Sequence, residues 1–225
     1  MQSLVWRNEL KHELNKGDCM RVESFVRTVA CADKNAGADA GYQVRSLYFD
    51  NVYDKALLEK TDGINEREKF RLRFYNHDPS YINLEKKMRY EGKSLKISCR
   101  VNEEECKKII AGDTDFMKDE NRPLLYELYA KMKSQQLRPF AIVDYTRKAY
   151  TYPSGNVRIT FDSDIRTVKY SSDIFNASLP SIPVYDGVIL EVKYDKYIPD
   201  IIGDIVRISQ RRTTPFSKYA VSRCV

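Results

Sequence analysis

The sequence predicts an α+β fold, a closed eight-stranded antiparallel β-barrel with helices packed outside it. Three observations lead to this prediction. About eight segments alternate apolar and polar residues with a period of two, the pattern of half-buried strands. The polar sides of these segments are rich in lysine and arginine, and stretches with near-helical apolar spacing separate them. If the polar sides face one another and helices cover the apolar sides, the strands can close around a wet interior.

The segment Arg67–Tyr75 (REKFRLRFY) shows the alternation most clearly. Its positions 70, 72 and 74 are apolar, and every odd position up to Arg73 is basic. Because successive side chains of a strand point to opposite faces, one face of this strand is apolar and the other is strongly cationic. The same pattern recurs in Tyr81–Tyr90 and Ser94–Val101, and the Glu91–Gly92 step between them predicts a tight hairpin turn.

The remaining elements follow from similar patterns. Further strands are predicted in residues 4–11 and in Tyr42–Asn51, Pro139–Tyr152, Val157–Asp162 and Val188–Tyr194. Apolar spacing and capping residues predict helices at Lys16–Ala30, Asn102–Ala111, Leu124–Gln136 and Pro199–Ser209. At this length, residues 1–225 are expected to form a single domain.

Composition narrows the class of protein. The 225 residues are 42% hydrophobic and 31% charged, as in an ordinary globular domain. The sequence has no apolar run long enough to cross a membrane and no secretory signal at its start, so a cytoplasmic protein is expected. Its five cysteines are scattered without a CxxC pair, which argues against a zinc site and a disulfide framework. The net charge of +6 favours an anionic partner only weakly.

The positions of the charged residues along the strands are more informative than the net charge. An antiparallel sheet usually leaves one face in water, so one interpretation puts these charges on a solvated surface. A solvated face tends to mix opposite charges across strands, however, whereas these polar sides carry many cations and few carboxylates. The cations are Lys11, Lys69, Arg71, Arg73, Lys87, Arg89, Lys96, Arg100, Arg147, Arg158 and Lys193, and the carboxylates are Glu9, Glu85, Asp162 and Glu191. Guanidinium groups match phosphate oxygens in pairs and carboxylates hold Mg²⁺ or Mn²⁺, so a shared cavity suits a metal-bound chain of phosphates.

Nine segments, taken in order, resemble the VTC-type polyphosphate polymerase domain, a branch of the CYTH-like triphosphate tunnel metalloenzymes. They are RNELK (7–11), VRSLYFDN (44–51), KFRLRFY (69–75), LEKK (84–87), GKSLK (92–96), DYTRKAY (144–150), VRITFD (157–162), ILEVKY (189–194) and FSKY (216–219). Their common order over nearly the whole chain makes the resemblance specific.

The resemblance implies an eight-stranded triphosphate tunnel. In it, the γ-phosphate of ATP or another nucleoside triphosphate passes to a growing inorganic polyphosphate chain, with Mn²⁺ or Mg²⁺ as cofactor. It implies that Arg71 and Arg73 grip the nucleotide phosphates. The residues implied to line the tunnel and bind phosphates of substrate and product are Lys87, Lys96, Arg147 and Arg158. Further basic positions near the tunnel, implied to take part in binding, are Lys11, Lys69, Lys193 and Lys218, and the metal ligands are Glu191 and, as a second candidate, Glu85.

The chain also departs from the family pattern. Pro215 stands where the eukaryotic polymerases carry a further lysine just before the FSKY-type segment. Arg7 stands where the triphosphatase branch, with its ExExK signature, has a metal-binding carboxylate, and this disfavours a triphosphatase. No inositol-phosphate sensor domain or membrane segment accompanies the catalytic unit, so regulation and product translocation are expected to need other proteins, including a membrane partner.

Two alternatives stay open. One is a triphosphatase or nucleotidase that uses the same tunnel with water as acceptor, and the other is a non-catalytic module that binds polyphosphate. Nucleic acid is disfavoured because the cationic faces lack interleaved aromatic residues, and most of the 16 tyrosines are expected in the core. The sequence has no Walker A or GxGxxG loop. His12 and His77 have no partner motif and are expected at the surface.

Overall fold

The structure is a computed structural model that describes residues 5–33, 41–118, 121–168, 171–207 and 213–224. Its centre is one antiparallel sheet, in which eight strands follow the order β1-β10-β8-β7-β3-β4-β5-β6, while β2 pairs with β7 and β9 with β8. The strands are β1 (Asn8–Leu14), β2 (Cys31–Ala32), β3 (Gly41–Asp50), β4 (Arg67–Tyr75), β5 (Asp78–Tyr90), β6 (Lys93–Val101), β7 (Arg138–Tyr152), β8 (Val157–Val168), β9 (Ile182–Tyr185) and β10 (Val188–Tyr194).

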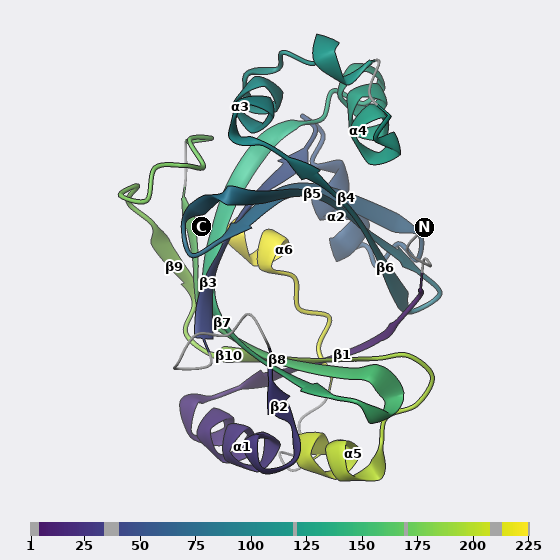
Figure 1. Ribbon diagram of the computed structural model, residues 1–225, viewed down its shortest axis with the longest axis vertical. Helices are drawn as coiled ribbons and strands as arrows, with labels where there is room; N and C mark the ends of the chain where they lie inside the picture. The colour runs from purple at the N-terminus through teal and green to yellow at the C-terminus, as the bar shows by residue number, and fades with distance from the viewer. Residues whose placement is uncertain (1–4, 34–40, 119–120, 169–170, 208–212, 225) are drawn as a thin grey trace.

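The sheet curls until its two end strands, β1 and β6, approach each other (Figure 1). Within the described residues they are joined by one antiparallel bridge, where the backbones of Arg7 and Ser94 exchange two hydrogen bonds of 2.9 Å. The predicted antiparallel sheet with helices is therefore confirmed. The predicted count of eight strands is exceeded by β2 and β9, which are too short to show an alternating pattern. Complete closure is not confirmed, because one bridge is not a continuous ladder of hydrogen bonds.

Over the described ranges, six α-helices surround or enter this sheet, namely α1 (Lys16–Val29), α2 (Lys55–Thr61), α3 (Glu103–Ala111), α4 (Pro123–Ser134), α5 (Asp200–Arg207) and α6 (Lys218–Ser222). Two short 3₁₀ turns occupy Asp115–Met117 and Ser154–Asn156. The four predicted helices are present, and the last residues predicted for α5 lie outside the described residues. A capping box fixes the start of α3, where Asn102 and Glu105 each accept a hydrogen bond from the other's backbone N–H. The sequence did not predict α2 and α6, which span two turns or fewer and show no helical period.

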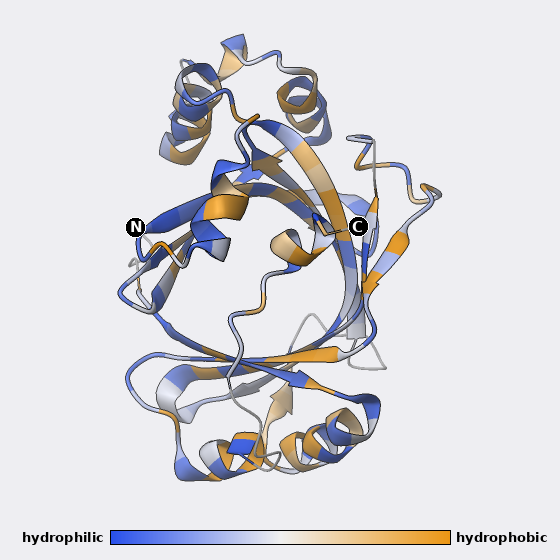
Figure 2. Ribbon diagram, turned by 180° about the vertical axis from the view of Figure 1, so that it is seen from behind, coloured by the Kyte–Doolittle hydropathy of each residue, from blue (hydrophilic) through white to orange (hydrophobic). Residues whose placement is uncertain are grey.

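Two helix pairs cover the outer faces of the sheet at opposite ends of the molecule, α3 with α4 and α1 with α5 (Figure 1). Apolar residues of β3 to β6 pack with Ile109 of α3 and Leu125 of α4. Apolar residues of β8 and β10 pack with Val26 of α1 and Ile202 of α5. Because these two clusters bury apolar residues on the outer faces of the sheet, the alternation turns the polar residues that flank them along each strand inward. Apolar and polar residues alternate along the strands in Figure 2.

The two histidines occupy different environments. His12 is 6% exposed, so the prediction of a surface position is wrong for it. On β1 it shares the outward, helix-covered face with Leu10 and Leu14, which lie two residues away on either side. His77 is half-buried in the turn between β4 and β5. None of the helices within the described ranges is long and apolar enough to cross a membrane.

Candidate active site

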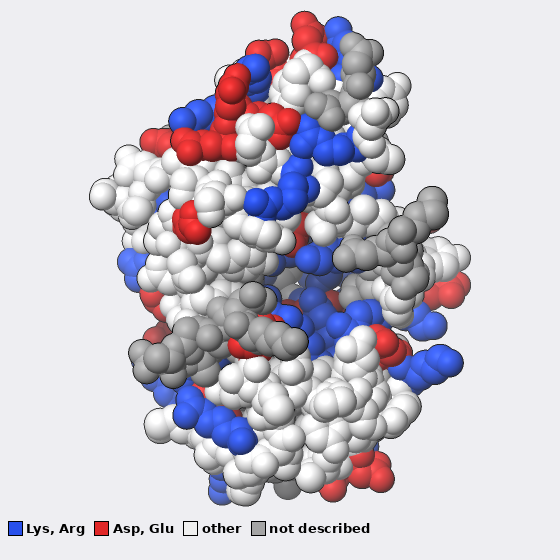
Figure 3. Space-filling view, in the orientation of Figure 1, with Lys and Arg blue, Asp and Glu red and all other residues white. Residues whose placement is uncertain are grey.

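The inner face of the sheet surrounds a cavity of about 1530 Å³. Fourteen of its lining residues are lysine or arginine, and three are aspartate or glutamate. In the space-filling view, lysine and arginine atoms gather around a hollow in the face of the molecule (Figure 3). The sequence-predicted site residues that line the cavity are Lys11, Lys69, Arg71, Arg73, Lys87, Lys96, Arg147, Arg158, Glu191, Lys193 and Lys218. Of the twelve predicted site residues, Glu85 alone is absent from the lining.

Glu85 lies on β5 between the cavity-lining residues Asn83 and Lys87, and it is only 1% exposed. Its Oε2 accepts a hydrogen bond of 2.8 Å from Arg71 Nε and lies 3.7 Å from Arg73 Nη1, while its Oε1 accepts one of 3.0 Å from Lys96 Nζ. Burial raises the pKa of Glu85, but these three cations outweigh that effect and hold the pKa well below its usual range. The carboxylate therefore stays charged and orients three cavity cations.

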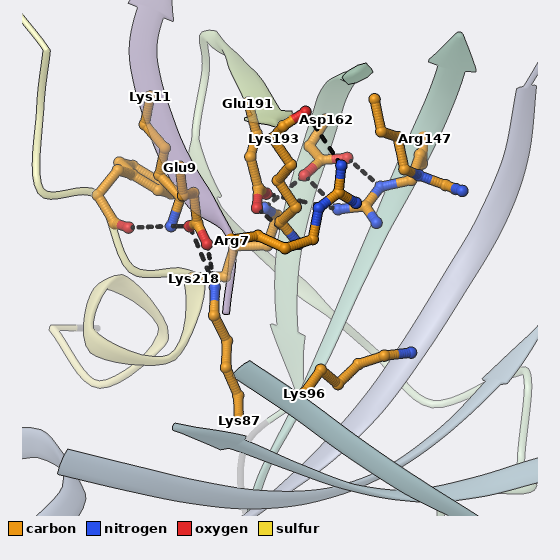
Figure 4. Close-up of polar contacts among 12 residues, drawn as sticks. Arg7, Glu9, Lys11, Lys87, Lys96, Arg147, Asp162, Glu191, Lys193 and Lys218 are labelled. Atoms are coloured by element: carbon orange, nitrogen blue, oxygen red, sulfur yellow. Dashed lines mark hydrogen bonds and ion pairs between the residues drawn. The ribbon is translucent and has the colours of Figure 1, made fainter. Parts of the chain in front are cut away.

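A second ionic cluster joins β1, β10 and β5 (Figure 4). Lys87 Nζ donates to Glu9 Oε1 and Oε2 at 3.1 and 2.8 Å, and Lys11 Nζ lies 2.8 Å from Glu9 Oε1. On the neighbouring strand, Glu191 Oε1 lies 3.0 Å from Lys193 Nζ. In the strand register Glu9 faces Lys193 and Lys11 faces Glu191, so the two carboxylates are diagonal neighbours.

The charges of this cluster perturb each other strongly. Burial and the charge of Glu191 raise the pKa of Glu9, but Lys87, Lys11 and Lys193 lower it far below its ordinary value. Burial lowers the pKa of Lys87 to about 8, although Glu9 acts in the opposite direction. Despite its distance to Lys193, Glu191 Oε1 accepts no hydrogen bond within the described part of the chain. Among the described residues its contact is therefore the ion pair with the Lys193 ammonium.

Asp162 anchors a third group. It is 0% exposed and accepts hydrogen bonds from Arg147 Nε at 2.6 Å, Arg147 Nη2 at 2.8 Å and Lys218 Nζ at 2.6 Å. Burial raises the pKa of Asp162, yet the two cations lower it to about 2. The bidentate contact fixes the plane of the Arg147 guanidinium at the cavity wall.

The C-terminal segment supplies Lys218 by passing through the hollow of the sheet, where α6 lies (Figure 1). Thr214 N donates to Lys11 O at 2.9 Å, and Lys11 Nζ donates to Phe216 O at 3.1 Å. The Tyr219 hydroxyl donates to the fully buried Asp50 at 2.5 Å. Asp50 also accepts hydrogen bonds from the first turn of α2, so one carboxylate ties α2 and α6 together.

The family of the chain is decided by a match to the family model of the VTC domain, which covers residues 6–225. The chain belongs to the VTC domain family. The resemblance noted in the sequence is thereby confirmed. Among curated proteins no match to this VTC domain was found.

Solved structures share the fold of this VTC domain at low sequence identity. A candidate adenylyl cyclase from Hippeastrum, whose dominant activity is that of a triphosphatase, is 12% identical, with a TM-score of 0.55 and coverage of 97% of this chain and 95% of that chain. A candidate adenylate cyclase from Bacillus halodurans is 12% identical, with a TM-score of 0.54 and coverage of 96% of both chains. At such identities the likeness establishes the fold of the VTC domain and leaves its reaction open.

Sequence reasoning missed several residues of the VTC domain's cavity. Glu9 and Asp162 were placed on polar strand faces but were given no role in a site. The two-residue spacing of Glu9 and Lys11 was the available signal, because it puts both on one strand face. Arg7 also borders the cavity, where its Nε donates to Asp195 at 2.8 Å. Arg158 lies 2.6 Å from Asp33 and donates to the Tyr42 hydroxyl at 3.1 Å.

The prediction that the cationic faces lack aromatic residues is wrong. The tyrosines that line the cavity are Tyr42, Tyr48, Tyr75, Tyr81, Tyr145 and Tyr219. Lys218 Nζ lies 4.7 Å from the ring centroid of Tyr145, and the Arg71 guanidinium lies 5.7 Å from that of Tyr48. Because Tyr48 and Tyr145 are buried, their rings brace cations in the wall and present no open face for stacking a base.

Proposed function

We propose that this VTC domain is a nucleotide-dependent polyphosphate polymerase, which transfers the γ-phosphate of ATP to a growing polyphosphate chain inside the cavity. The observation that carries the proposal is the excess of lysine and arginine around one large shared cavity. The nearby carboxylates offset part of this charge and leave the wall positive, and a phosphate chain supplies several negative charges in a row. The family membership supports the same substrate class. The closed tunnel is part of this proposal, with the Arg7–Ser94 bridge as its seam.

The donor set fits a divalent cation that is shared with the substrate. The described residues hold no group of three histidine, cysteine or acidic side chains that could enclose a metal ion by themselves. Mg²⁺ in phosphate-transferring sites commonly takes one or two carboxylates, and phosphate oxygens and waters complete its shell. Glu191 and Glu9 are the adjacent carboxylates that line the cavity, and Glu191 Oε1 accepts no hydrogen bond from the described residues. We therefore propose these two as ligands of Mn²⁺ or Mg²⁺ in place of the pair Glu191 and Glu85, because Glu85 does not line the cavity.

The metal, when bound, would neutralise charge on the phosphate oxygens that bridge donor and acceptor. The remaining requirements fall on the chain itself. Phosphoryl transfer passes through a loose transition state and needs alignment and charge compensation rather than a covalent nucleophile from the protein. Arg71 and Arg73, oriented by Glu85, would hold the nucleotide phosphates. Arg147 and Lys218, oriented by Asp162, would bind the oxygens on which charge develops.

The acceptor in this proposal is the terminal phosphate of the chain. Along β4, Arg67, Lys69, Arg71 and Arg73 all line the cavity, and at two residues per step this row extends for about 20 Å. A row of this length offers contacts to more phosphates than one nucleotide carries. Arg7, held by Asp195, places a cation where a triphosphatase of this fold has a carboxylate.

Incubation with ATP and Mn²⁺ tests the proposal directly. We expect a ladder of long anionic product on a gel. Release of free phosphate without a ladder would instead establish the triphosphatase, the activity named for the Hippeastrum protein of the same fold. If ATP stays intact with every divalent metal tried, the domain is a polyphosphate-binding module. Glu191→Gln and Arg71→Ala should each abolish the ladder, whereas Lys107→Ala on the outer helix α3 should leave it unchanged.

A further inference from the structure

One end of the cavity carries cations that form no ion pair with a carboxylate among the described residues. Arg67 at the start of β4 and Arg89 near the end of β5 both line the cavity and face each other in the strand register. Lys60 of α2, a helix that packs against β4, lines the same cavity. Among the described residues Lys60 and Arg89 form no ion pair, and Arg67 donates only to the carbonyl of Ile64.

This cluster of Lys60, Arg67 and Arg89, here called the basic mouth, is electrostatically strained. Like charges directly opposite on neighbouring strands destabilise a sheet. Burial lowers the pKa of Lys60, and the charges of Arg67, Lys11 and Arg89 lower it further. Burial and Arg89 likewise lower the pKa of Arg67, and the charges of Glu59 and Glu9 offset this lowering only in part.

Cations deeper in the cavity, in contrast, are paired with carboxylates. Arg71 is paired with Glu85, Lys87 with Glu9, and Arg147 with Asp162. The fold therefore supplies carboxylate partners to the deeper cations. Among the described residues, no carboxylate lies within ion-pair distance of the three cations of the basic mouth. An anion from outside would remove the repulsion at this end.

We propose that the basic mouth binds the distal phosphates of a polyphosphate chain, and that the chain leaves the cavity over Lys60, Arg67 and Arg89. This inference rests on the proposed function. The charges sit on two strands and a helix, so they match a ligand with several successive negative charges better than a single small anion. Continuity favours the same ligand, since Lys69 lies between Arg67 and Arg71 on one strand face at steps of about 7 Å.

The proposal separates two classes of ligand. A triphosphate held by Arg71, Arg73 and Arg147 does not need the basic mouth, whereas a longer chain reaches it. The test variant is Arg67→Ala/Arg89→Ala, and Arg67→Gln/Arg89→Gln is a second variant that preserves more of the side-chain volume. The control Lys107→Ala/Lys108→Ala removes the same charge on the outer helix α3, where the two lysines pair with Glu103 and Glu104.

The measurement is the affinity for tripolyphosphate and for long-chain polyphosphate over a series of salt concentrations. We expect the test variants to bind the long chain roughly tenfold more weakly than the unmodified protein, with the salt slope of log K reduced by about 1.5 for two lost phosphate contacts. Affinity for tripolyphosphate should change less than about twofold, because a triphosphate held deeper in the cavity does not touch the basic mouth and salt screens the remaining attraction. The control should match the unmodified protein for both ligands.

Three outcomes contradict the inference in different ways. Unchanged long-chain affinity in both test variants overturns the exit over the basic mouth while leaving the proposed function intact. If the unmodified protein binds neither phosphate ligand, the proposed function itself fails. If single-stranded DNA binds the mouth as tightly as polyphosphate and loses the same affinity in the variants, the mouth is a general polyanion surface, and its assignment to a phosphate chain is wrong.

Discussion

Replacement of Glu85 by glutamine tests the electrostatic design of the cavity most directly. Glu85 is 1% exposed, and its Oε2 lies 2.6 Å from Arg71 Nη2 and 3.7 Å from Arg73 Nη1, while Lys96 Nζ contacts Oε1 at 3.0 Å. Glu85→Gln keeps the shape of the side chain and removes its charge. Three neighbouring cations then lose their shared counter-ion.

The expected magnitude follows from the burial of the pair. Removal of one partner of a buried ion pair costs about 3–5 kcal/mol, because the other partner remains buried and uncompensated. Arg73 is buried and Arg71 partly buried, while Lys96 is exposed and relaxes into solvent, so we expect about 3 kcal/mol. For a chain of this size each kcal/mol lowers the melting temperature by about 2–4 °C, which gives a decrease of about 6–12 °C.

The assay is thermal unfolding with and without tripolyphosphate. If the cations are poised for phosphate, the ligand replaces the missing negative charge, so it should raise the melting temperature of Glu85→Gln more than that of the unmodified protein. Glu104→Gln is the control, since Glu104 is 78% exposed in its pair with Lys108 and should cost less than about 0.5 kcal/mol. Equal melting temperatures for Glu85→Gln and the unmodified protein, with equal gains from tripolyphosphate, would refute the role given to Glu85.

Three further predictions concern single groups of the cavity. Burial lowers the pKa of Lys69 to about 8. Affinity for tripolyphosphate should therefore fall between pH 7 and pH 9 as this amine loses its proton. Lys69→Arg should make that decrease smaller in a binding titration, because arginine keeps its charge. The pKa of Asp162 is lowered to about 2 in the folded protein. Its contribution to stability is therefore complete above its pKa in the unfolded chain, about 4, and is lost as the pH falls toward 2. Asp162→Asn should cost about 2 kcal/mol of unfolding free energy in urea at pH 6, with a smaller difference at pH 3. Tyr219→Phe removes the hydroxyl that donates to Asp50 at 2.5 Å and should cost about 1–3 kcal/mol. Because α6 carries Lys218, this variant should also slow ATP turnover by more than Leu125→Ala, a change at an equally buried position of the outer helix α4, and equal rates would show that the tie to Asp50 does not position Lys218.

The inward cations were predictable because their placement depends on local geometry. A strand alternates its faces residue by residue, so the sequence REKFRLRFY alone places Lys69, Arg71 and Arg73 on one side of β4. The capping box of α3 is equally local, since Asn102 and Glu105 are three residues apart. The sign of the charges also predicted the kind of ligand, because a cationic face so poor in carboxylates indicates a bound anion.

The ionic partners could not be predicted in the same way. Glu9 contacts Lys87, and the two are 78 residues apart in the chain; Lys218 reaches Asp162 over 56 residues. Such pairs depend on the register between neighbouring strands and on the curvature of the sheet. Local propensity does not determine either quantity. The burial of His12 was not predictable either. Alternation puts His12 on the same face of β1 as Leu10 and Leu14, but this face is buried only because α1 and α5 pack over it.

The sequence by itself therefore determined which side chains share a strand face and what charge that face carries, because both are properties of neighbours in the chain. Only the tertiary structure decided that Glu85 holds cations in the wall, that Glu9 stands beside Glu191, and that α6 enters the hollow with Lys218. Each of these contacts joins segments whose meeting depends on the curvature of the whole sheet.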